Sequence, residues 1–375
     1  MDRKQTIFFN RAIITTGTKR LFLFVLLSVL ISSPCIAESV QKISSSDKRL
    51  EYMGRTGKTD DAVVFSWPGT SVTVNFEGTD LAVKMRDEKG DNYYYVVVDN
   101  ADPVKINPDT VLSMYQLAAH LKKGNHTVVL YKLTESSWGK TWIYDFELNE
   151  HAKVLPPAKR TRRIEFYGNS ITAGYSVDDS VRDSKTPEYS NSYFSYAAIT
   201  ARHYKASYSF IAKSGIGLML SWFQIIMPEM YDRQYEDDPT QKWNFKNYTP
   251  DIVVINLLQN DAKLMPKHDY PQFKYRFGIA APDEKFIVNA YKDFIHSIRT
   301  KYPKATIICA LGCMDAVKPG SPWPGYITKA VQATKDKKIL THFFAFNNSN
   351  IHPKRKGQQD MANDLIKFID GHVKW

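Results

Sequence analysis

The sequence lacks the short motifs that usually indicate a bound metal or nucleotide. It contains no HExxH or H-x-H spacing, so a zinc site has no support. It also contains no GxxxxGK[ST] or GxGxxG, which excludes the common phosphate-binding loops. Only three cysteines occur in 375 residues, too few for a disulfide framework. We therefore expect a protein that needs no metal and no other cofactor.

Long apolar runs are scarce as well. The run at 21–31 is shorter than the ~20 apolar residues that a membrane span requires. It follows a basic region that ends at Lys19 and Arg20, and small residues, Cys35 and Ala37, precede the expected cleavage point. This pattern predicts a signal peptide over residues 1–37 and hence a secreted or periplasmic protein without a membrane span.

The formal net charge is +11, but the basic residues are scattered along the chain and form no stripe with aromatic residues. This distribution argues against a nucleic-acid partner. Cys309 and Cys313 lie in one apolar run, and two strand positions four apart are about 13 Å apart at roughly 3.3 Å per residue. That distance exceeds disulfide reach, so we expect two core thiols.

The first half of the chain reads as β-structure. Short apolar runs such as 62–67, 71–76 and 142–148 are separated by turn signals rich in Gly and Pro. Strands at this spacing predict a β-sandwich of jelly-roll type over residues 46–155. The segment 115–124 is the one exception, which reads as a helix or as a loop turn. Aromatic residues make up 13% of the chain, which suits β-cores and also suits sugar stacking.

The second half alternates between strand-like and helix-like segments. A basic, proline-containing linker at 153–163 leads into a predicted second domain at 161–375. Five apolar runs are suited to buried parallel strands, at 162–168, 206–212, 251–258, 305–312 and 339–346. Apolar stripes predict helices, with Phe286, Ala290, Phe294 and Ile298 on one face of the segment 286–303. The alternation predicts an α/β fold of three layers, α/β/α, with a flavodoxin-like parallel sheet.

Polar residues follow the strands of this predicted sheet. Ser170, Gly215 and Asn260 come after the first three strands, and His352 follows the last. Ligands bind at the carboxyl edge of such sheets, so these residues are candidates for one site. Ser170 would be a nucleophile and His352 its base, while the N–H groups of Ser170 and Gly215 and the Asn260 amide would stabilise an oxyanion. Taken singly, each is also an ordinary turn residue.

Together the four blocks resemble those of the SGNH (GDSL-type) hydrolases. The closest similarity is to carbohydrate esterase family 2, which joins an N-terminal β-sandwich to an SGNH domain. The segments that carry it are IEFYGNSITAGYS, AKSGIGL, VVINLLQND and IHPKRKGQ. The resemblance implies a serine esterase that removes O-acetyl groups from acetylated xylan or glucomannan, as acetyl xylan esterases do.

Three positions depart from the family pattern. Asn169 stands where Asp is usual, and Leu258 stands where the pattern has Gly, at the expected mouth of the pocket. Ser349 occupies the position of the usual acid, three residues before His352. The sequence therefore predicts a Ser-His dyad with the histidine oriented by a backbone carbonyl, or else an acid from another segment.

Other assignments remain open at this stage. Trp323 follows the fourth strand and is a candidate for stacking on a sugar, although a tryptophan packed in its own loop is an equal alternative; Trp222 and Trp243 share this ambiguity. A catalytically weak carbohydrate-binding protein is the alternative function, and a lipase or thioesterase is a third. We expect a monomer.

Overall fold

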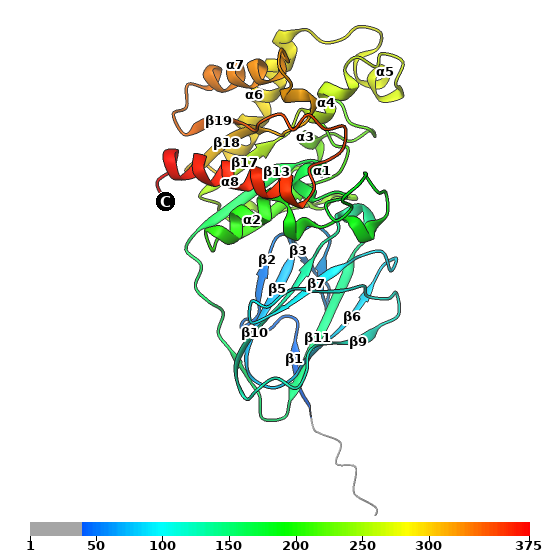
Figure 1. Cartoon of the computed structure of the whole chain (residues 1–375), viewed down its shortest axis with the longest axis vertical. Helices are drawn as coiled ribbons and strands as arrows, with labels where there is room; N and C mark the ends of the chain where they lie inside the picture. Colours follow the sequence, from blue (N-terminus) through cyan, green and yellow to red (C-terminus); the bar gives the residue numbers. More distant parts are fainter. Residues whose placement is uncertain (1–39) are drawn as a thin grey trace, which may run out of the picture. The chain divides into compact units, whose positions relative to one another are not determined.

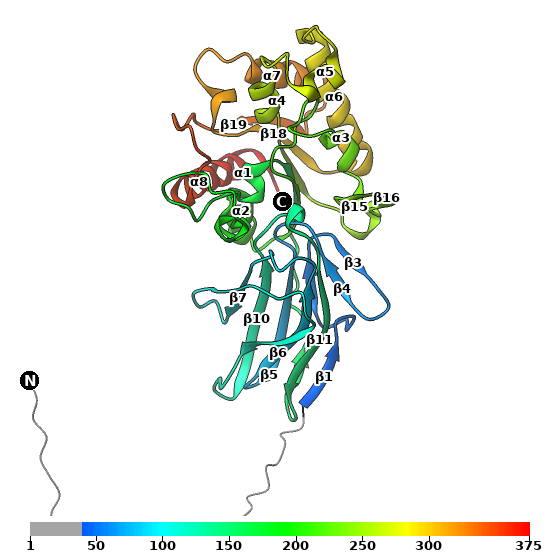
Figure 2. The same ribbon diagram turned by 90° about the vertical axis from the view of Figure 1, so that its right-hand side faces the viewer.

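The computed structural model describes residues 40–375, which form one compact unit (Figures 1 and 2). The predicted signal peptide at 1–37 lies outside the described residues. Among those that are described, no helix has the length and hydrophobicity to cross a membrane.

The N-terminal part is a sandwich of two antiparallel sheets, each with six strands. The first sheet has the order β3-β4-β11-β6-β9, with β1 paired to β11; the second has the order β12-β5-β10-β7-β8, with β2 paired to β5. The strands are β1 (Val40–Ser44), β2 (Glu51–Met53), β3 (Thr56–Lys58), β4 (Val63–Phe65), β5 (Ser71–Gly78), β6 (Leu81–Asp87), β7 (Tyr94–Val98), β8 (Val104–Ile106), β9 (Ser113–Ala118), β10 (Gly124–Lys132), β11 (Thr141–Asn149) and β12 (Lys153–Leu155).

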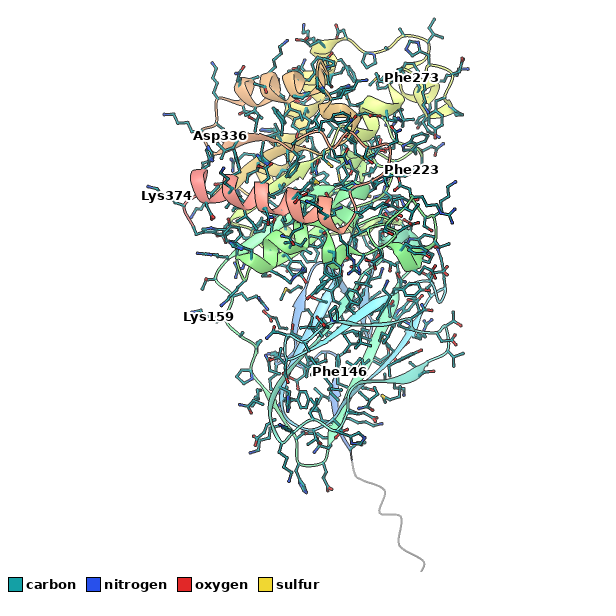
Figure 3. All side chains as sticks on the ribbon, in the orientation of Figure 1. Phe146, Lys159, Phe223, Phe273, Asp336 and Lys374 are labelled. Carbon is teal, nitrogen blue, oxygen red and sulfur yellow. The ribbon has the colours of Figure 1, made fainter. Side chains whose placement is uncertain are left out.

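Alternating side chains build the core of the sandwich. In β11, Ile143, Phe146 and Leu148 are buried, and a register shift between residues 143 and 145 keeps all three on the inner face. Figure 3 shows Phe146 among the strands of the sandwich. The two sheets thus bury one apolar layer between them, as a β-sandwich requires.

The helix-like reading of 115–124 is wrong. Residues 113–118 form β9, an edge strand that pairs antiparallel with β6. Tyr115 and Leu117 lie toward the core while Met114 and Gln116 are exposed, which is the period of a strand.

The second part is a five-stranded, wholly parallel sheet with the order β14-β13-β17-β18-β19. Its strands are β13 (Arg163–Gly168), β14 (Ser207–Ala212), β17 (Ile252–Asn256), β18 (Thr306–Leu311) and β19 (Ile339–Phe343). In chain order this is the flavodoxin-like sequence 2-1-3-4-5, whose switch point lies between β13 and β17. The predicted α/β class is confirmed, and all five predicted strands are present.

Helices cover both faces of this sheet, which makes three layers (Figure 1). One face carries α3 (Met227–Met230), α6 (Glu284–Lys301) and α7 (Trp323–Thr334); the other carries α1 (Ser170–Ala173), α2 (Tyr196–His203) and α8 (Arg355–His372). The remaining elements are α4 (Gln259–Leu264), α5 (Pro271–Phe277), the hairpin β15 (Arg233–Tyr235) with β16 (Asp238–Lys242), and the 3-10 turns η1 (Ser136–Trp138), η2 (Pro187–Tyr189), η3 (Ser192–Phe194), η4 (Phe245–Asn247) and η5 (Asp315–Val317). Cys309 and Cys313 are free, buried thiols, as predicted.

The sandwich and the α/β part share a core and a buried ion pair. Met53, Tyr95 and Tyr131 of the sandwich pack in the same apolar cluster as α2 and α8. Arg55 lies 3.3 Å from Glu165 of β13, and both side chains are fully buried. The two parts therefore form one packed body within the described residues.

Candidate active site

Ser170 lies at the carboxyl end of β13, at the switch point of the sheet. β13 ends at Gly168, and Asn169 caps α1 by accepting a hydrogen bond from the Ile171 N–H at 3.0 Å. α1 ends after one turn because Gly174 adopts the left-handed conformation, with φ of 77°. An amide at position 169 is a good N-cap, so this departure from the family pattern keeps the turn that presents Ser170.

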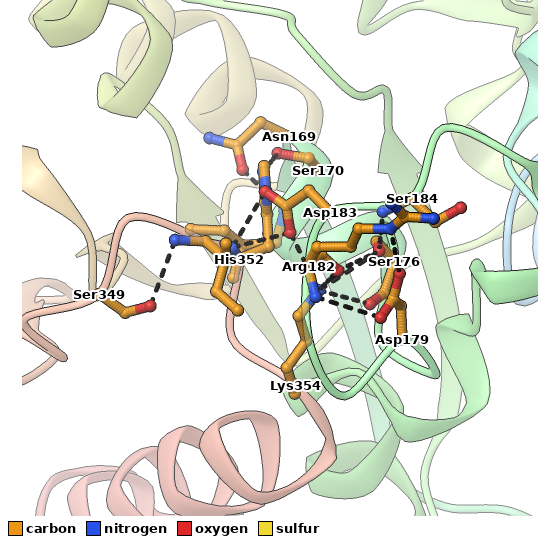
Figure 4. Close-up of polar contacts among 12 residues, drawn as sticks. Asn169, Ser170, Ser176, Asp179, Arg182, Asp183, Ser184, Ser349, His352 and Lys354 are labelled. Carbon is orange, nitrogen blue, oxygen red and sulfur yellow. Dashed lines mark hydrogen bonds and ion pairs between the residues drawn. The ribbon is translucent and has the colours of Figure 1, made fainter.

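His352 meets Ser170 although 182 positions separate them in the chain. Its Nε2 lies 2.7 Å from the Ser170 Oγ. His352 belongs to the loop between β19 and α8, which crosses the carboxyl edge of the sheet (Figure 4). A nucleophile and a base are thus within hydrogen-bond distance before any substrate is present.

An acid does orient the histidine, and the predicted dyad needs this correction. The Asp183 Oδ2 lies 2.7 Å from the His352 Nδ1, and the carboxylate also accepts the His352 backbone N–H (Figure 4). Since the bond to Asp183 uses the Nδ1 proton, Nε2 is left free to accept the proton of Ser170. The structure therefore gives a Ser170–His352–Asp183 chain of hydrogen bonds.

Lys354 fixes the loop that carries Asp183. Its Nζ donates to the carbonyl oxygens of Ser176 at 2.8 Å and Arg182 at 2.7 Å, and lies 2.9 Å from the Asp183 Oδ1. Partial burial alone would raise the pKa of Asp183, but the hydrogen bond and charge of His352, together with Lys354, hold this pKa well below its usual value. Asp183 therefore stays ionised at neutral pH, and its negative charge holds the His352 ring in place.

Sequence reasoning missed Asp183 because nothing in its spacing marks it. It lies in a polar loop between α1 and η2, among other acids, and far from the block that contains His352. Ser349, at the usual acid position, instead accepts a hydrogen bond from the Ile351 N–H at 3.2 Å and stabilises a turn. The acidic loop was the only available signal, and it does not distinguish Asp183 from Asp178 or Asp179.

A cavity of about 320 Å³ opens beside Ser170 and His352. Trp222 and Asn260 line it, and the Trp222 side chain is 41% exposed. The Asn260 Oδ1 accepts the Trp222 indole N–H at 3.1 Å, and its Nδ2 donates to the Ile216 carbonyl at 2.8 Å. These two bonds fix the amide plane and leave one amide hydrogen for a ligand.

The structure brings Ser170, Asn260 and His352 to one cavity, but Gly215 does not line it. Gly215 lies next to it in a left-handed turn, with φ of 84°, and its carbonyl accepts the Trp222 N–H at 3.0 Å. Within the described residues, neither the Gly215 N–H nor the Ser170 N–H has a hydrogen-bond partner. Glu135 of the sandwich holds the adjacent Ser214 N–H at 2.5 Å.

Of the two alternatives for Trp323 the structure supports packing, and the expected role of Leu258 at the pocket mouth is wrong. Trp323 begins α7 and is only 8% exposed in the core on that face of the sheet, so it offers no surface to a sugar. Leu258 does not shape the pocket mouth, because its side chain is fully buried in the same core. It holds a left-handed φ of 78° immediately before α4, which explains why glycine suits this position.

Asp261, in contrast, has a structural role beside the site. Its carboxylate accepts three backbone N–H groups, from Leu218 at 2.9 Å, Met219 at 2.7 Å and Leu220 at 2.9 Å. The carboxylate ties α4 to the segment after β14. Asn260 and Gly215 are thereby held in a fixed relation to each other.

A serine, a histidine and an acid at the carboxyl edge of this sheet define a serine acylhydrolase of the GDSL type. Residues 166–359 match the GDSL-like Lipase/Acylhydrolase family, and residues 52–157 match the family Carbohydrate esterase 2 N-terminal. The chain belongs to carbohydrate esterase family 2.

Several known proteins are similar over most of the chain. The cellulase/esterase CelE of Acetivibrio thermocellus is 34% identical over 354 residues, which cover 90% of this chain but only 41% of CelE. An acetylxylan esterase / glucomannan deacetylase of Cellvibrio japonicus is 24% identical over 93% of this chain and 96% of its own length. The structure of a family two carbohydrate esterase from Clostridium thermocellum in complex with cellohexaose matches 86% of this chain and 98% of its own, with 31% identity and a TM-score of 0.76.

Proposed function

We propose that this protein is a secreted serine esterase that removes O-acetyl groups from plant cell-wall polysaccharides such as xylan or glucomannan. The observation that carries the proposal is the hydrogen-bonded chain from Ser170 through His352 to Asp183 beside an open cavity. The similarity to the acetylxylan esterase / glucomannan deacetylase of Cellvibrio japonicus supports the substrate class. The predicted signal peptide at 1–37 supports secretion.

The geometry supports an acyl-transfer mechanism in two steps. His352 takes the hydroxyl proton through Nε2 while the Ser170 Oγ attacks the acetyl carbonyl carbon. The resulting oxyanion is held by the N–H groups of Ser170 and Gly215 and by the Asn260 amide. His352 then returns the proton to the leaving sugar oxygen, and the acetyl group stays on Ser170. Water, deprotonated by His352, then attacks the acetyl carbon, and acetate leaves as His352 returns this proton to the Ser170 Oγ.

The lining of the cavity favours a small acyl group on a polar substrate. Trp222 and Met314 are its apolar side chains, whereas Gln259, Lys263 and other polar or charged residues form the rest. A lipase or a thioesterase for long acyl chains would need an extended apolar groove. Sugar hydroxyls, in contrast, find hydrogen-bond partners on such a lining.

The test is acetate release from acetylated xylan and acetylated glucomannan, with p-nitrophenyl acetate as a simple ester. We expect the wild type to release acetate and Ser170→Ala to lose at least about 10³-fold in rate. Ser297→Ala, which removes a hydroxyl from α6 on another part of the surface, is the matched control and keeps the wild-type rate. Equal rates for Ser170→Ala and the wild type would refute the assignment.

A second candidate function is retention of a glucan chain without turnover. Trp222 is exposed at the cavity, and aromatic rings stack on sugar rings. The Clostridium thermocellum relative carries cellohexaose in its structure. Titration of cellohexaose into Ser170→Ala tests this function. Binding by Ser170→Ala that is lost when Trp222→Ala is added to the same protein would support it. No binding by Ser170→Ala argues against it.

A further inference from the structure

We propose that Asp178 is a positioning residue for ester hydrolysis, because it fixes the loop that carries Asp183 against both the sandwich and α8. This loop, the acid loop, spans residues 174–186 between α1 and η2. The inference rests on the proposed function, since it concerns the same reaction. Asp178 does not line the cavity beside Ser170, so its effect on the reaction has to pass through the acid loop.

Both carboxylate oxygens of Asp178 accept hydrogen bonds from other parts of the chain. The Oδ1 accepts from the Arg355 Nε at 2.8 Å and lies 2.7 Å from the Nη2 of the same side chain. The Oδ2 accepts from the Lys105 Nζ at 3.0 Å and from the Asn191 Nδ2 at 2.8 Å. The Asp178 side chain is 11% exposed. A largely buried carboxylate between two cations is thus held by charge-assisted hydrogen bonds, which are stronger than those between neutral groups.

The sandwich contributes to this arrangement through two strands. Lys105 belongs to β8, and its Nζ also donates to the Glu188 carbonyl at 2.8 Å, just beyond the acid loop. The Asn191 Nδ2 donates to the hydroxyl of Tyr95 in β7 at 2.8 Å as well. The Asn191 N–H donates to the Gly174 carbonyl at 2.8 Å, which closes the base of the loop. The sandwich therefore helps to fix the path of the acid loop.

The segment that carries His352 holds the acid loop at two points. His352 and Lys354 bind the Asp183 carboxylate (Figure 4). Arg355, the first residue of α8, binds Asp178 earlier in the same loop. A change at Asp178 therefore alters how Asp183 meets the His352 ring. Misplacement of a catalytic group by about 1 Å can cost about 10²-fold in rate.

The neighbouring Asp179 provides a matched control, because its contacts are local. Its Oδ1 accepts the N–H groups of Val181 and Arg182, at 3.0 and 3.1 Å, inside the acid loop. The oxygen of an amide side chain can accept the same two bonds. Asp179→Asn thus removes one negative charge next to Asp178 and keeps the local turn.

Steady-state kinetics of p-nitrophenyl acetate hydrolysis test the inference. We expect Asp178→Asn to lower kcat by about 10²-fold with KM unchanged, since it misplaces Asp183 and leaves the cavity lining intact. Asp179→Asn should keep the wild-type kcat. Lys105→Met should lower kcat by about tenfold, because Arg355 stays in place. Lys105→Arg should recover most of this loss, since a guanidinium can also donate to Asp178.

A double-mutant cycle shows whether Asp178 acts through Asp183. If it does, adding Asp178→Asn to Asp183→Asn should lower kcat no further, whereas two independent losses multiply. Thermal unfolding of each variant establishes that it is folded. If Asp178→Asn does not fold, Lys105→Met, at a side chain that is 31% exposed, takes its place in the cycle.

The inference is overturned if Asp178→Asn has the wild-type kcat, or if the two losses multiply. A Ser170→Ala variant as active as the wild type would refute the proposed function, and this inference with it. An inactive Ser170→Ala beside a fully active Asp178→Asn refutes the positioning role alone.

Discussion

Among single residues, Asp183 has a large expected effect on the chemistry because it acts through His352. We predict that Asp183→Asn lowers kcat for p-nitrophenyl acetate by about 10³–10⁴-fold, since an amide can hold the histidine in the wrong tautomer. Asp360→Asn, on the exposed side of α8, is the matched control and should leave kcat unchanged. A wild-type rate for Asp183→Asn would mean that the histidine needs no acid.

The same carboxylate contributes to stability with a defined pH dependence. The folded-state pKa of Asp183 is depressed, so its contribution is complete above the unfolded value of about 3.9 and is lost as the pH falls below that value. The Asp183→Asn variant should therefore lose stability relative to the wild type at neutral pH. This difference should shrink in acid.

Leu258 combines a strained backbone with a buried side chain, and the two effects oppose each other. A left-handed conformation costs a non-glycine residue about 1–2 kcal/mol, which Leu258→Gly would recover. Loss of a fully buried leucine side chain costs about 2–5 kcal/mol. The loss of packing exceeds the relief of strain, so we predict that Leu258→Gly unfolds at a lower urea concentration than the wild type. Acetate release should be retained. A variant more stable than the wild type would show that strain dominates.

Several site residues were predictable because their chemistry is tied to strand ends. Ser170 and His352 follow the first and last parallel strands, and the carboxyl ends of such strands share one edge. The stacking role of Trp323 could not be predicted, because burial of a ring depends on tertiary packing. Its position after β18 is equally compatible with a core helix. Asp183 could not be predicted, because a long loop can bring an acid to the histidine from any distance in the sequence.

At the scale of helices and strands, the spacing of apolar residues explains which predictions were right and which were wrong. The five parallel strands were predictable as apolar runs buried on both faces. In α6, however, the buried face is formed by Ile287, Tyr291, Phe294 and Ile298, and Phe286 is 49% exposed. A strict spacing of four drifts around a helix of 3.6 residues per turn. In β9, pairing with β6 overrode the helix-like composition of 115–124.

Strand β10 ends in a buried lysine that couples stability to pH. Burial lowers the pKa of Lys132 to about 7, against about 10.4 in the unfolded chain, although Asp87 and Glu135 oppose the shift. The unfolded state then binds more protons between these values, so the contribution of Lys132 to stability rises as the pH increases from about 7 toward 10.

This linkage predicts the behaviour of Lys132→Met. The variant has no proton to lose, so its advantage in free energy of unfolding over the wild type should be greatest near pH 6 and should fall by pH 9. Urea unfolding of both proteins at several pH values measures the difference. A difference that does not change with pH would mean that Lys132 keeps its proton in the folded protein.

At the scale of the whole molecule, the sandwich and the α/β part contact each other through charged groups as well as apolar ones. Arg55 pairs with Glu165 and also donates to the carbonyl oxygens of Tyr231 and Arg233, at 2.6 and 2.9 Å. A buried pair of this kind fixes a relative position more than it adds net stability. The sandwich and the α/β fold were both predictable from the sequence. The contacts of Arg55 were not, because they join positions more than a hundred residues apart and no local pattern indicates them.

Glu135 of the sandwich binds the backbone beside Gly215, whose N–H we propose as an oxyanion donor. It follows β10, is 4% exposed, and accepts the Ser214 N–H beside Gly215. We predict that Glu135→Ala lowers kcat by about 10–100-fold with little change in KM, because a displaced Gly215 N–H stabilises the oxyanion less well. Glu135→Gln should recover part of this loss, since the amide oxygen can still accept the hydrogen bond. Steady-state kinetics and thermal unfolding of both variants distinguish this positioning role from simple packing: a folded Glu135→Ala with wild-type kcat would restrict the sandwich to structural support.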